Sequence, residues 1–107
     1  MTVITEHSTS ITLINVFTVE PDRSRELAGV LSAATDAVMQ HIPGFISANI
    51  HLSTDGTRVV NYAQWASVAD MEAMQQNPAA REHMATAAEL ATSFEPHLYT
   101  VESVHSK

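Results

Sequence analysis

Three kinds of side chain in this 107-residue sequence could take part in chemistry: amides, one indole and imidazoles. Asn61 and the only tryptophan, Trp65, lie four residues apart in RVVNYAQW, whose β-branched and aromatic residues predict a strand. Because side chains alternate along a strand, Asn61 and Trp65 share one face. An amide and an indole N–H are neutral donors that can stabilise an oxyanion developing on a bound molecule. His51 and His83 are the two histidines that could reach such a site and act as a base.

The composition excludes several other kinds of chemistry. The absence of cysteine rules out disulfides, iron–sulfur clusters, thiolate zinc sites and thiol nucleophiles. Twelve acidic against five basic residues give a net charge of −7, which argues against nucleic acid and anionic membranes as partners. No two histidines have the i, i+4 helical spacing of a metal site, and the sequence lacks GxGxxG and GxxxxGK[ST]. We therefore expect neither a bound metal nor a dinucleotide or phosphate site.

The length fits one domain, which we place at residues 11–107 behind a flexible segment at residues 1–10. The first ten residues contain no Lys or Arg and no apolar run, so no signal peptide is predicted. No stretch approaches the ~20 apolar residues of a membrane span. These features lead us to expect a soluble, cytoplasmic protein.

The elements that must position the candidate residues follow from apolar spacing and from turn residues. A helix is predicted to begin at Pro21-Asp22 and to stop before Pro43-Gly44. Its apolar residues have helical spacing and form one stripe: Leu27, Val30, Leu31, Ala34 and Val38. Asn77-Pro78 interrupts a second helical pattern. The predicted order is strand 11–20, helix 21–42, strand 45–52, strand 58–65, helix 68–76 continued over 79–92, and strand 94–104. This β-α-β-β-α-β order predicts an α+β, ferredoxin-like fold with the helices on one face of the sheet.

The other face of this sheet is expected to be too apolar for contact with water. The residues assigned to it are Ile14, Val16, Ile46, Ile50, Val60 and Tyr62. A second copy that stacks sheet against sheet would cover them, so we predict a homodimer. The alternative is a monomer with one wet face.

The turn between the predicted strands 45–52 and 58–65 decides which of their polar residues lie opposite one another. A two-residue turn at Asp55-Gly56 would place Asn61 opposite Ile50, whereas a three-residue loop at 54–56 would place it opposite Asn49. The second register separates polar from apolar side chains, so we predict it. It places Ser47, Asn49, His51, Asn61 and Trp65 together under the helices. Asn15, between Leu13 and Phe17 on the first strand, is either a satisfied structural amide or part of the same site.

Four segments carry a resemblance to a known family. INVFTVEP, PGFISANIH, HLSTDGTRVVNYAQWAS and NPAAREHM resemble the antibiotic biosynthesis monooxygenase family. The resemblance covers residues 11–104, and its most specific part is 55–65. It implies a dimeric α+β barrel with a buried pocket between the sheet and the helices of each protomer.

Within that family the chain looks most like the small oxygenases that convert anthrone-type aromatic polyketides to quinones without metal or flavin. Their substrate-facing asparagine and tryptophan match Asn61 and Trp65, and the histidine of the preceding strand matches His51. Some of them carry a tyrosine where this chain has Met71. The resemblance thus implies catalysis by Asn61, Trp65 and His51, with O2 and a small aromatic substrate and no cofactor. The residues expected to bind the substrate are Asn15, Phe17, Asn49, Met71 and His83.

This chemistry is coherent without a cofactor, because an ionised phenol or enol can itself give an electron to dioxygen. The protein then needs to desolvate and orient the substrate and to stabilise the developing oxyanion. Two other functions stay open. Haem-degrading enzymes of this fold hold haem through a helical histidine near a first-strand asparagine, which His83 and Asn15 resemble, although their tryptophan is missing here. The third possibility is a non-catalytic dimeric barrel that binds a hydrophobic molecule or assists a biosynthetic complex.

Overall fold

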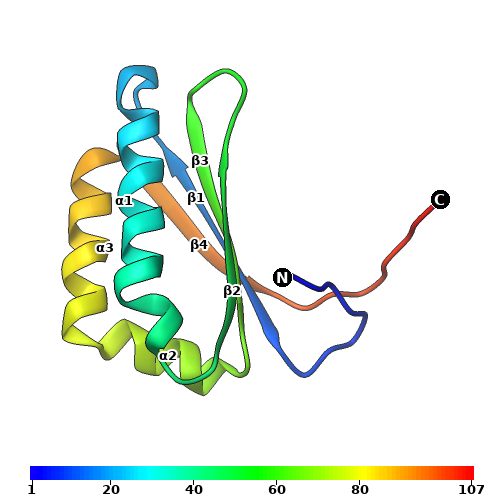
Figure 1. Cartoon of the computed structure of the whole chain (residues 1–107). Coiled ribbons are helices and arrows are strands. Elements are labelled where there is room, and N and C mark those ends of the chain that lie inside the picture. Colours follow the sequence, from blue (N-terminus) through cyan, green and yellow to red (C-terminus); the bar gives the residue numbers. More distant parts are fainter.

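Alternating β-branched runs and two helical stretches produce a sheet with one helical layer, as seen in a computed structural model that describes all 107 residues (Figure 1). The sheet is antiparallel, in the order β2-β3-β1-β4, and α1 and α3 lie side by side on one face of it. The elements are β1 (Ile11–Thr18), η1 (Pro21–Arg23), α1 (Ser24–Ala37), η2 (Met39–His41), β2 (Phe45–Leu52), β3 (Arg58–Trp65), α2 (Val68–Gln76), α3 (Pro78–Leu90) and β4 (Ser93–Tyr99). The predicted ferredoxin-like α+β fold is confirmed.

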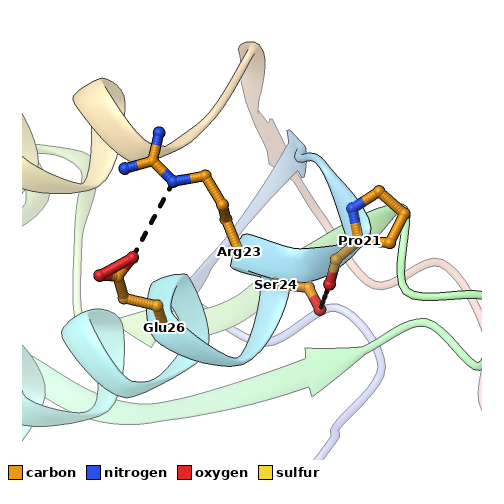
Figure 2. A network of polar contacts seen from close by, with 4 residues as sticks. All are labelled: Pro21, Arg23, Ser24 and Glu26. Atoms are coloured by element: carbon orange, nitrogen blue, oxygen red, sulfur yellow. Dashed lines mark hydrogen bonds and ion pairs between the residues drawn. The ribbon is translucent and has the colours of Figure 1, made fainter.

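The first helix begins later than predicted, because Pro21–Arg23 forms a 3-10 turn before α1. The buried Ser24 hydroxyl donates to the Pro21 carbonyl over 2.9 Å and ties this turn to α1 (Figure 2). Arg23 and Glu26 form an exposed ion pair at 3.9 Å on the same turn. Exposed pairs of this kind contribute little, so the buried hydroxyl is the main local constraint on the start of α1.

The predicted break in the second helical region is confirmed at Asn77. The Asn77 side chain accepts a hydrogen bond from the Ala80 N–H over 3.1 Å, and Pro78 occupies the first position of α3. Ser67 caps α2 in the same way, accepting from the Asp70 N–H over 3.1 Å. The cap and the proline end α2 and start α3 in a new direction, and this directs α3 back over the sheet.

Two hydrophobic clusters join the helices to the sheet. The first contains Phe17, Val19, Leu27, Val59 and Ala87. The second contains Ala63, Trp65, Met71, Met74 and Ala80. Both clusters include residues of β3, so this central strand is held at either end of its helix-covered face.

The last strand is shorter than predicted. We expected it to run over 94–104, but β4 ends at Tyr99, which pairs with Thr12 near the start of β1. Since β1 begins at Ile11, only that one residue lies beyond the last pair, and β1 offers no partner for the rest of the chain. Every residue of β4 is exposed, which distinguishes this edge strand from β3.

The two ends of the chain lie on the side of the sheet away from the helices (Figure 1). The His7 N–H donates to the Val101 carbonyl over 2.9 Å, and the Gln64 amide donates to the Val3 carbonyl over 2.8 Å. Residues 1–10 are therefore tied both to the C-terminal segment and to β3. No helix is both long and apolar enough to cross a membrane.

Candidate active site

The β2–β3 hairpin has the register that we did not predict. Asn61 pairs with Ile50, and Asn49 pairs with Tyr62. The loop spans the four residues 54–57, because the Ser53 N–H donates to the Arg58 carbonyl and closes the hairpin there. Asp55 organises this loop by accepting from the Thr57 hydroxyl over 2.7 Å, the Thr57 N–H over 3.0 Å and the Ser53 hydroxyl over 2.8 Å. These bonds, first those from Thr57 and then that from Ser53, lower the pKa of the Asp55 carboxyl to about 2.

This register reverses the predicted faces of β2. Ile50 and Leu52 pack toward the first hydrophobic cluster on the helix-covered face, so assigning Ile50 to the opposite face was wrong. Ser47, Asn49 and His51 alternate with them and therefore lie on the other side of the sheet. A β-bulge between Phe45 and Ser47 brings Phe45 opposite Trp65 and leaves Ile46 48% exposed.

Asn49 and His51 consequently lie outside the predicted pocket. The Asn49 side chain donates to the Tyr62 carbonyl over 3.1 Å and accepts from the Thr2 hydroxyl over 2.9 Å. The exposed His51 ring contacts the Asn49 carbonyl at 3.2 Å. Placing both side chains beside Asn61 and Trp65 was wrong, because the inner positions of β2 are occupied by the apolar side chains that pack against α1.

A cavity of about 410 Å³ lies between the sheet and the helical layer. All four strands contribute to its sheet side, including Leu13, Phe17 and Phe94, and α1, α2 and α3 contribute to its helix side. The volume lies within the range of pockets that bind drug-sized ligands, roughly 300–1,000 Å³. The cavity is mostly apolar and contains a few polar side chains, as in most small-molecule sites.

Three buried polar atoms in the lining have no hydrogen-bond partner: Asn15 Oδ1, Asn61 Oδ1 and Trp65 Nε1. Asn15 and Asn61 are direct cross-strand partners, so their Cβ atoms lie about 5 Å apart. Trp65 is 2% exposed, and its ring stands edge-on to Phe45 with the centroids 5.5 Å apart. An unsatisfied buried polar group costs about 1–3 kcal/mol. A ligand with suitably placed polar atoms would recover that energy.

The helical layer adds further polar side chains to the lining. Half-buried His83 and exposed Arg81 come from α3, and Gln75 comes from the end of α2. No carboxylate lines the cavity, so His83 is the only lining side chain of the type that usually serves as a general base. The structure thus brings together Asn15, Phe17, Asn61, Trp65 and His83.

Met71 lies in the second hydrophobic cluster beside Trp65 and does not line the cavity. Our reasoning from sequence missed Arg81, Gln75 and Phe94 as lining residues. Arg81 could have been found from spacing, because it precedes Met84 and Ala88 by three and seven residues on one face of α3. No group of three or more His, Asp or Glu residues is arranged to hold a metal ion.

Comparison with known proteins gives a consistent result. The model of a family described as antibiotic biosynthesis monooxygenase matches residues 10–86, which include every polar lining residue named above. The chain is 51% identical over 72 residues to tetracenomycin-F1 monooxygenase of Streptomyces glaucescens. That match covers 67% of this chain and 64% of the relative, so the chain spans somewhat less than two thirds of the curated protein's length.

Solved structures share the fold. A monooxygenase from the ActVA-Orf6 gene of Streptomyces coelicolor, in complex with nanaomycin D, matches with a TM-score of 0.83 and 26% identity over 92% of each chain. SnoaB of Streptomyces nogalater, a cofactor-independent oxygenase whose N63A mutant was solved, matches with a TM-score of 0.81 and 21% identity. That match covers 94% of this chain and 100% of SnoaB, and at this identity it shows the fold alone.

Proposed function

We propose a function from one premise: this chain belongs to the antibiotic biosynthesis monooxygenase family. We infer that it is a monooxygenase that oxidises an aromatic polyketide of the anthrone or naphthol type to a quinone with O2, without a cofactor. The observation that carries this proposal is the set of three unpaired polar atoms, from Asn15, Asn61 and Trp65, in an otherwise apolar cavity. The curated relative is named as a tetracenomycin-F1 monooxygenase, which supports a substrate of the polyketide class.

The first step is removal of a proton from the substrate. In this proposal His83 takes the proton, because it is the only general base of the usual kind in the lining. His51, which the family resemblance suggested for this role, is exposed on the other side of the sheet. The resulting phenolate or enolate is an electron-rich anion enclosed in an apolar cavity.

The second step is electron transfer to dioxygen. The anion gives one electron to O2, and the radical pair combines to form a carbon–oxygen bond and a peroxide. Loss of water from the peroxide leaves the quinone carbonyl, so one oxygen atom enters the product and the other leaves as water. The balance is anthrone plus O2 giving quinone plus H2O, and no external reductant is consumed.

The sheet residues stabilise the oxyanion formed in the first step. The Trp65 N–H and the Asn61 and Asn15 amides are neutral donors held on the rigid central strands β3 and β1. Fixed donors in a water-excluded site act more strongly than they would in water. Trp65 Nε1 has no protein acceptor, so its N–H is free for a substrate oxygen. The unpaired Oδ1 atoms of Asn61 and Asn15 are acceptors and would take hydrogen bonds from substrate hydroxyl groups.

Oxygen uptake tests the proposal directly. Purified protein, with a chelator present and no added flavin, is mixed with emodinanthrone under air. We expect uptake of one O2 per quinone formed, well above the rate with heat-denatured protein. Absence of such uptake across a panel of anthrones and naphthols, while an aromatic ligand stays bound and unchanged, would identify a binding module instead.

A second candidate function has one observation in its favour, since Asn15 and His83 line the same cavity. That pair resembles the asparagine and histidine of haem-degrading enzymes of this fold. Haemin titration distinguishes the two functions. We expect no His83-dependent Soret shift, and a tight shift abolished by His83→Ala would favour haem degradation.

We also propose that the chain is a homodimer joined through the open face of the sheet, the face away from the helices. Ile14, Val16, Val60 and Tyr62 form the centre of this face by strand alternation, and residues 1–10 contact it at Asn49 and Gln64. A second copy would bury this apolar centre. Light scattering should give twice the 11.6 kDa of the chain, and Val60→Asp, if folded by circular dichroism, should give the single mass. A wild-type mass of one chain would refute the dimer.

A further inference from the structure

Side-chain sulfur in this chain is concentrated around the cavity. The sequence has five methionines and no cysteine, so every sulfur atom is a thioether. Three methionines line the cavity: Met39 from η2, Met74 from α2 and Met84 from α3. Methionine often fills irregular gaps in apolar interiors, but its sulfur is also the atom of the side chain that a peroxide oxidises. A peroxide formed in the cavity would therefore meet three oxidisable groups.

Two methionines of α2 share the same packing and differ in their relation to the cavity. Met71 and Met74 are each 5% exposed, and both belong to the second hydrophobic cluster. Met74 lines the cavity, whereas Met71 does not. Bulk solvent thus has equally little access to both, and a molecule in the cavity meets Met74 alone of the two. The pair forms a matched comparison within one helix.

Two exposed methionines differ in the same way. Met84 is 37% exposed and lines the cavity, whereas Met1 is fully exposed and does not. The N-terminus lies on the side of the sheet away from the helices (Figure 1). A peroxide in bulk solvent would attack by exposure and reach Met1 first, whereas a peroxide bound in the cavity would reach Met74 and Met84.

We propose that the methionines lining the cavity are oxidation sites, to which an aromatic hydroperoxide held in the cavity transfers one oxygen atom. This inference rests on the proposed function, in which such a hydroperoxide forms there. The O–O bond breaks as the S–O bond forms, so the sulfur is oxidised by two electrons to a sulfoxide and the hydroperoxide is reduced to an alcohol. The balance of this side reaction is anthrone plus O2 plus methionine giving hydroxyanthrone plus methionine sulfoxide, with no quinone and no water.

Oxidation at these positions would limit the life of the enzyme. A sulfoxide replaces a flexible apolar side chain with a polar one. At Met74 it would place an acceptor oxygen in the cluster that contains Trp65, whose N–H has no protein partner. Activity should therefore fall as the lining methionines are oxidised, and methionine sulfoxide reductases should restore it.

A first experiment needs no turnover. Purified protein is treated with cumene hydroperoxide, an apolar aromatic hydroperoxide, or with hydrogen peroxide, and the sulfoxides are located by mass spectrometry of tryptic peptides. Met71 and Met74 fall in the same peptide, residues 59–81, so fragment ions compare them directly. With cumene hydroperoxide we expect Met74 to be oxidised about tenfold faster than Met71, because binding raises the local concentration of the oxidant. With hydrogen peroxide we expect Met1 to be oxidised first, by exposure.

A second experiment follows turnover of emodinanthrone under air, with catalase present to remove free hydrogen peroxide. Sulfoxide at Met74 and Met84 should increase with the quinone formed, while Met1 stays unmodified. Met74→Leu combined with Met84→Leu keeps side chains of similar size and should raise the number of turnovers completed before activity is lost. Met71→Leu should leave the rate of Met74 oxidation unchanged. Equal oxidation of Met71 and Met74 by cumene hydroperoxide, or no oxidation of Met74, would overturn the inference.

The inference and the proposed function fail in different ways. If cumene hydroperoxide oxidises Met74 in preference to Met71 but no anthrone consumes O2, the monooxygenase proposal fails and the oxidation site stands. If quinone forms with uptake of one O2 each while Met74 stays unmodified, the monooxygenase proposal stands and the inference is refuted.

Discussion

On the helix-covered face of the sheet, Asn15 and Asn61 leave buried oxygens without partners, whereas on the open face the side chain of Asn49 is satisfied. Gln64 and Ser47, also on the open face, form a 2.7 Å hydrogen bond, and the Gln64 amide donates to Val3 as well. The same sheet therefore satisfies amides on one side and leaves them unsatisfied on the other. In the function we propose, the unpaired atoms serve a ligand at a cost in stability, as is common at functional sites.

The largest effect on kcat should come from replacing a histidine. His83 lies on the helix-covered face and His51 on the open face, so their variants show which face supplies the general base. His83→Gln should lower kcat by about 10²–10⁴-fold, because a positioned general base contributes that much. The matched His51→Gln on the open face should leave kcat unchanged. Oxygen-uptake rates with one anthrone measure both. A large loss in His51→Gln alone would assign the base to the open face.

Asn61→Leu should separate activity from stability. We expect kcat to fall about 100-fold, as for the loss of one oxyanion donor. The free energy of unfolding should rise by about 1 kcal/mol, since an unsatisfied buried amide is replaced by an apolar side chain of similar size. Urea denaturation and oxygen uptake on the same preparation give the two values.

Asn49→Leu is the counterpart on the open face and should behave in the opposite way. It removes hydrogen bonds to Thr2 and to the Tyr62 carbonyl, so the free energy of unfolding should fall by about 1 kcal/mol while kcat stays the same. If both leucine variants shift stability in the same direction, the contrast between the faces is not a matter of unpaired amides.

Trp65→Phe removes the indole N–H together with part of a buried ring. The phenyl ring retains an aromatic contact with Phe45, and only the unpaired donor is lost with part of the ring. We expect a fall in kcat of about tenfold. The free energy of unfolding should fall by about 1–2 kcal/mol, because the smaller ring leaves a void in the buried cluster. Unchanged kcat would remove Trp65 from the proposed oxyanion site.

The smallest effect concerns the hairpin loop, which belongs to neither face. The pKa of Asp55 is lowered from its ordinary value of 3.8 to about 2, first by the hydrogen bonds from Thr57 and then by the one from Ser53. A carboxyl whose pKa is lowered in the folded state stabilises the fold at pH values above its ordinary pKa of 3.8. This contribution is lost as the pH falls from there through about 2. We therefore expect the Asp55 carboxyl carbon to titrate near pH 2 by NMR, and the acid sensitivity of the hairpin to be smaller in Asp55→Asn. Titration near 3.8 would mean that the bonds from Thr57 and Ser53 do not persist in solution.

The sequence predicted β2, β3 and α2 at their observed bounds, because turn residues and helix breakers stand at their ends. It failed at the register, where we assumed that polar residues on neighbouring strands gather on one face. In fact the polar set of β2 lies on the open face, while Asn61 and Trp65 of β3 lie among apolar residues. A ligand site breaks the segregation rule, because its polar groups are placed for a molecule that the sequence does not contain.

The sequence predicted some of the residues of the candidate site and missed others. Asn15, Phe17, Asn61, Trp65 and His83 were named from their residue types and the family resemblance, and all line the cavity. Arg81 was missed because an isolated arginine on a helix is usually solvated, although its helical spacing to Met84 and Ala88 places it on the face of α3 that lines the cavity.

The position of the chain ends affects how the protein is best produced. Both ends lie on the side of the sheet opposite the helices, and His7 and Val101 are joined there by a hydrogen bond. A purification tag fused to either end would crowd that side while leaving the cavity clear. Activity measured on tagged material would then be informative, whereas its oligomeric state should be measured only after the tag has been cleaved.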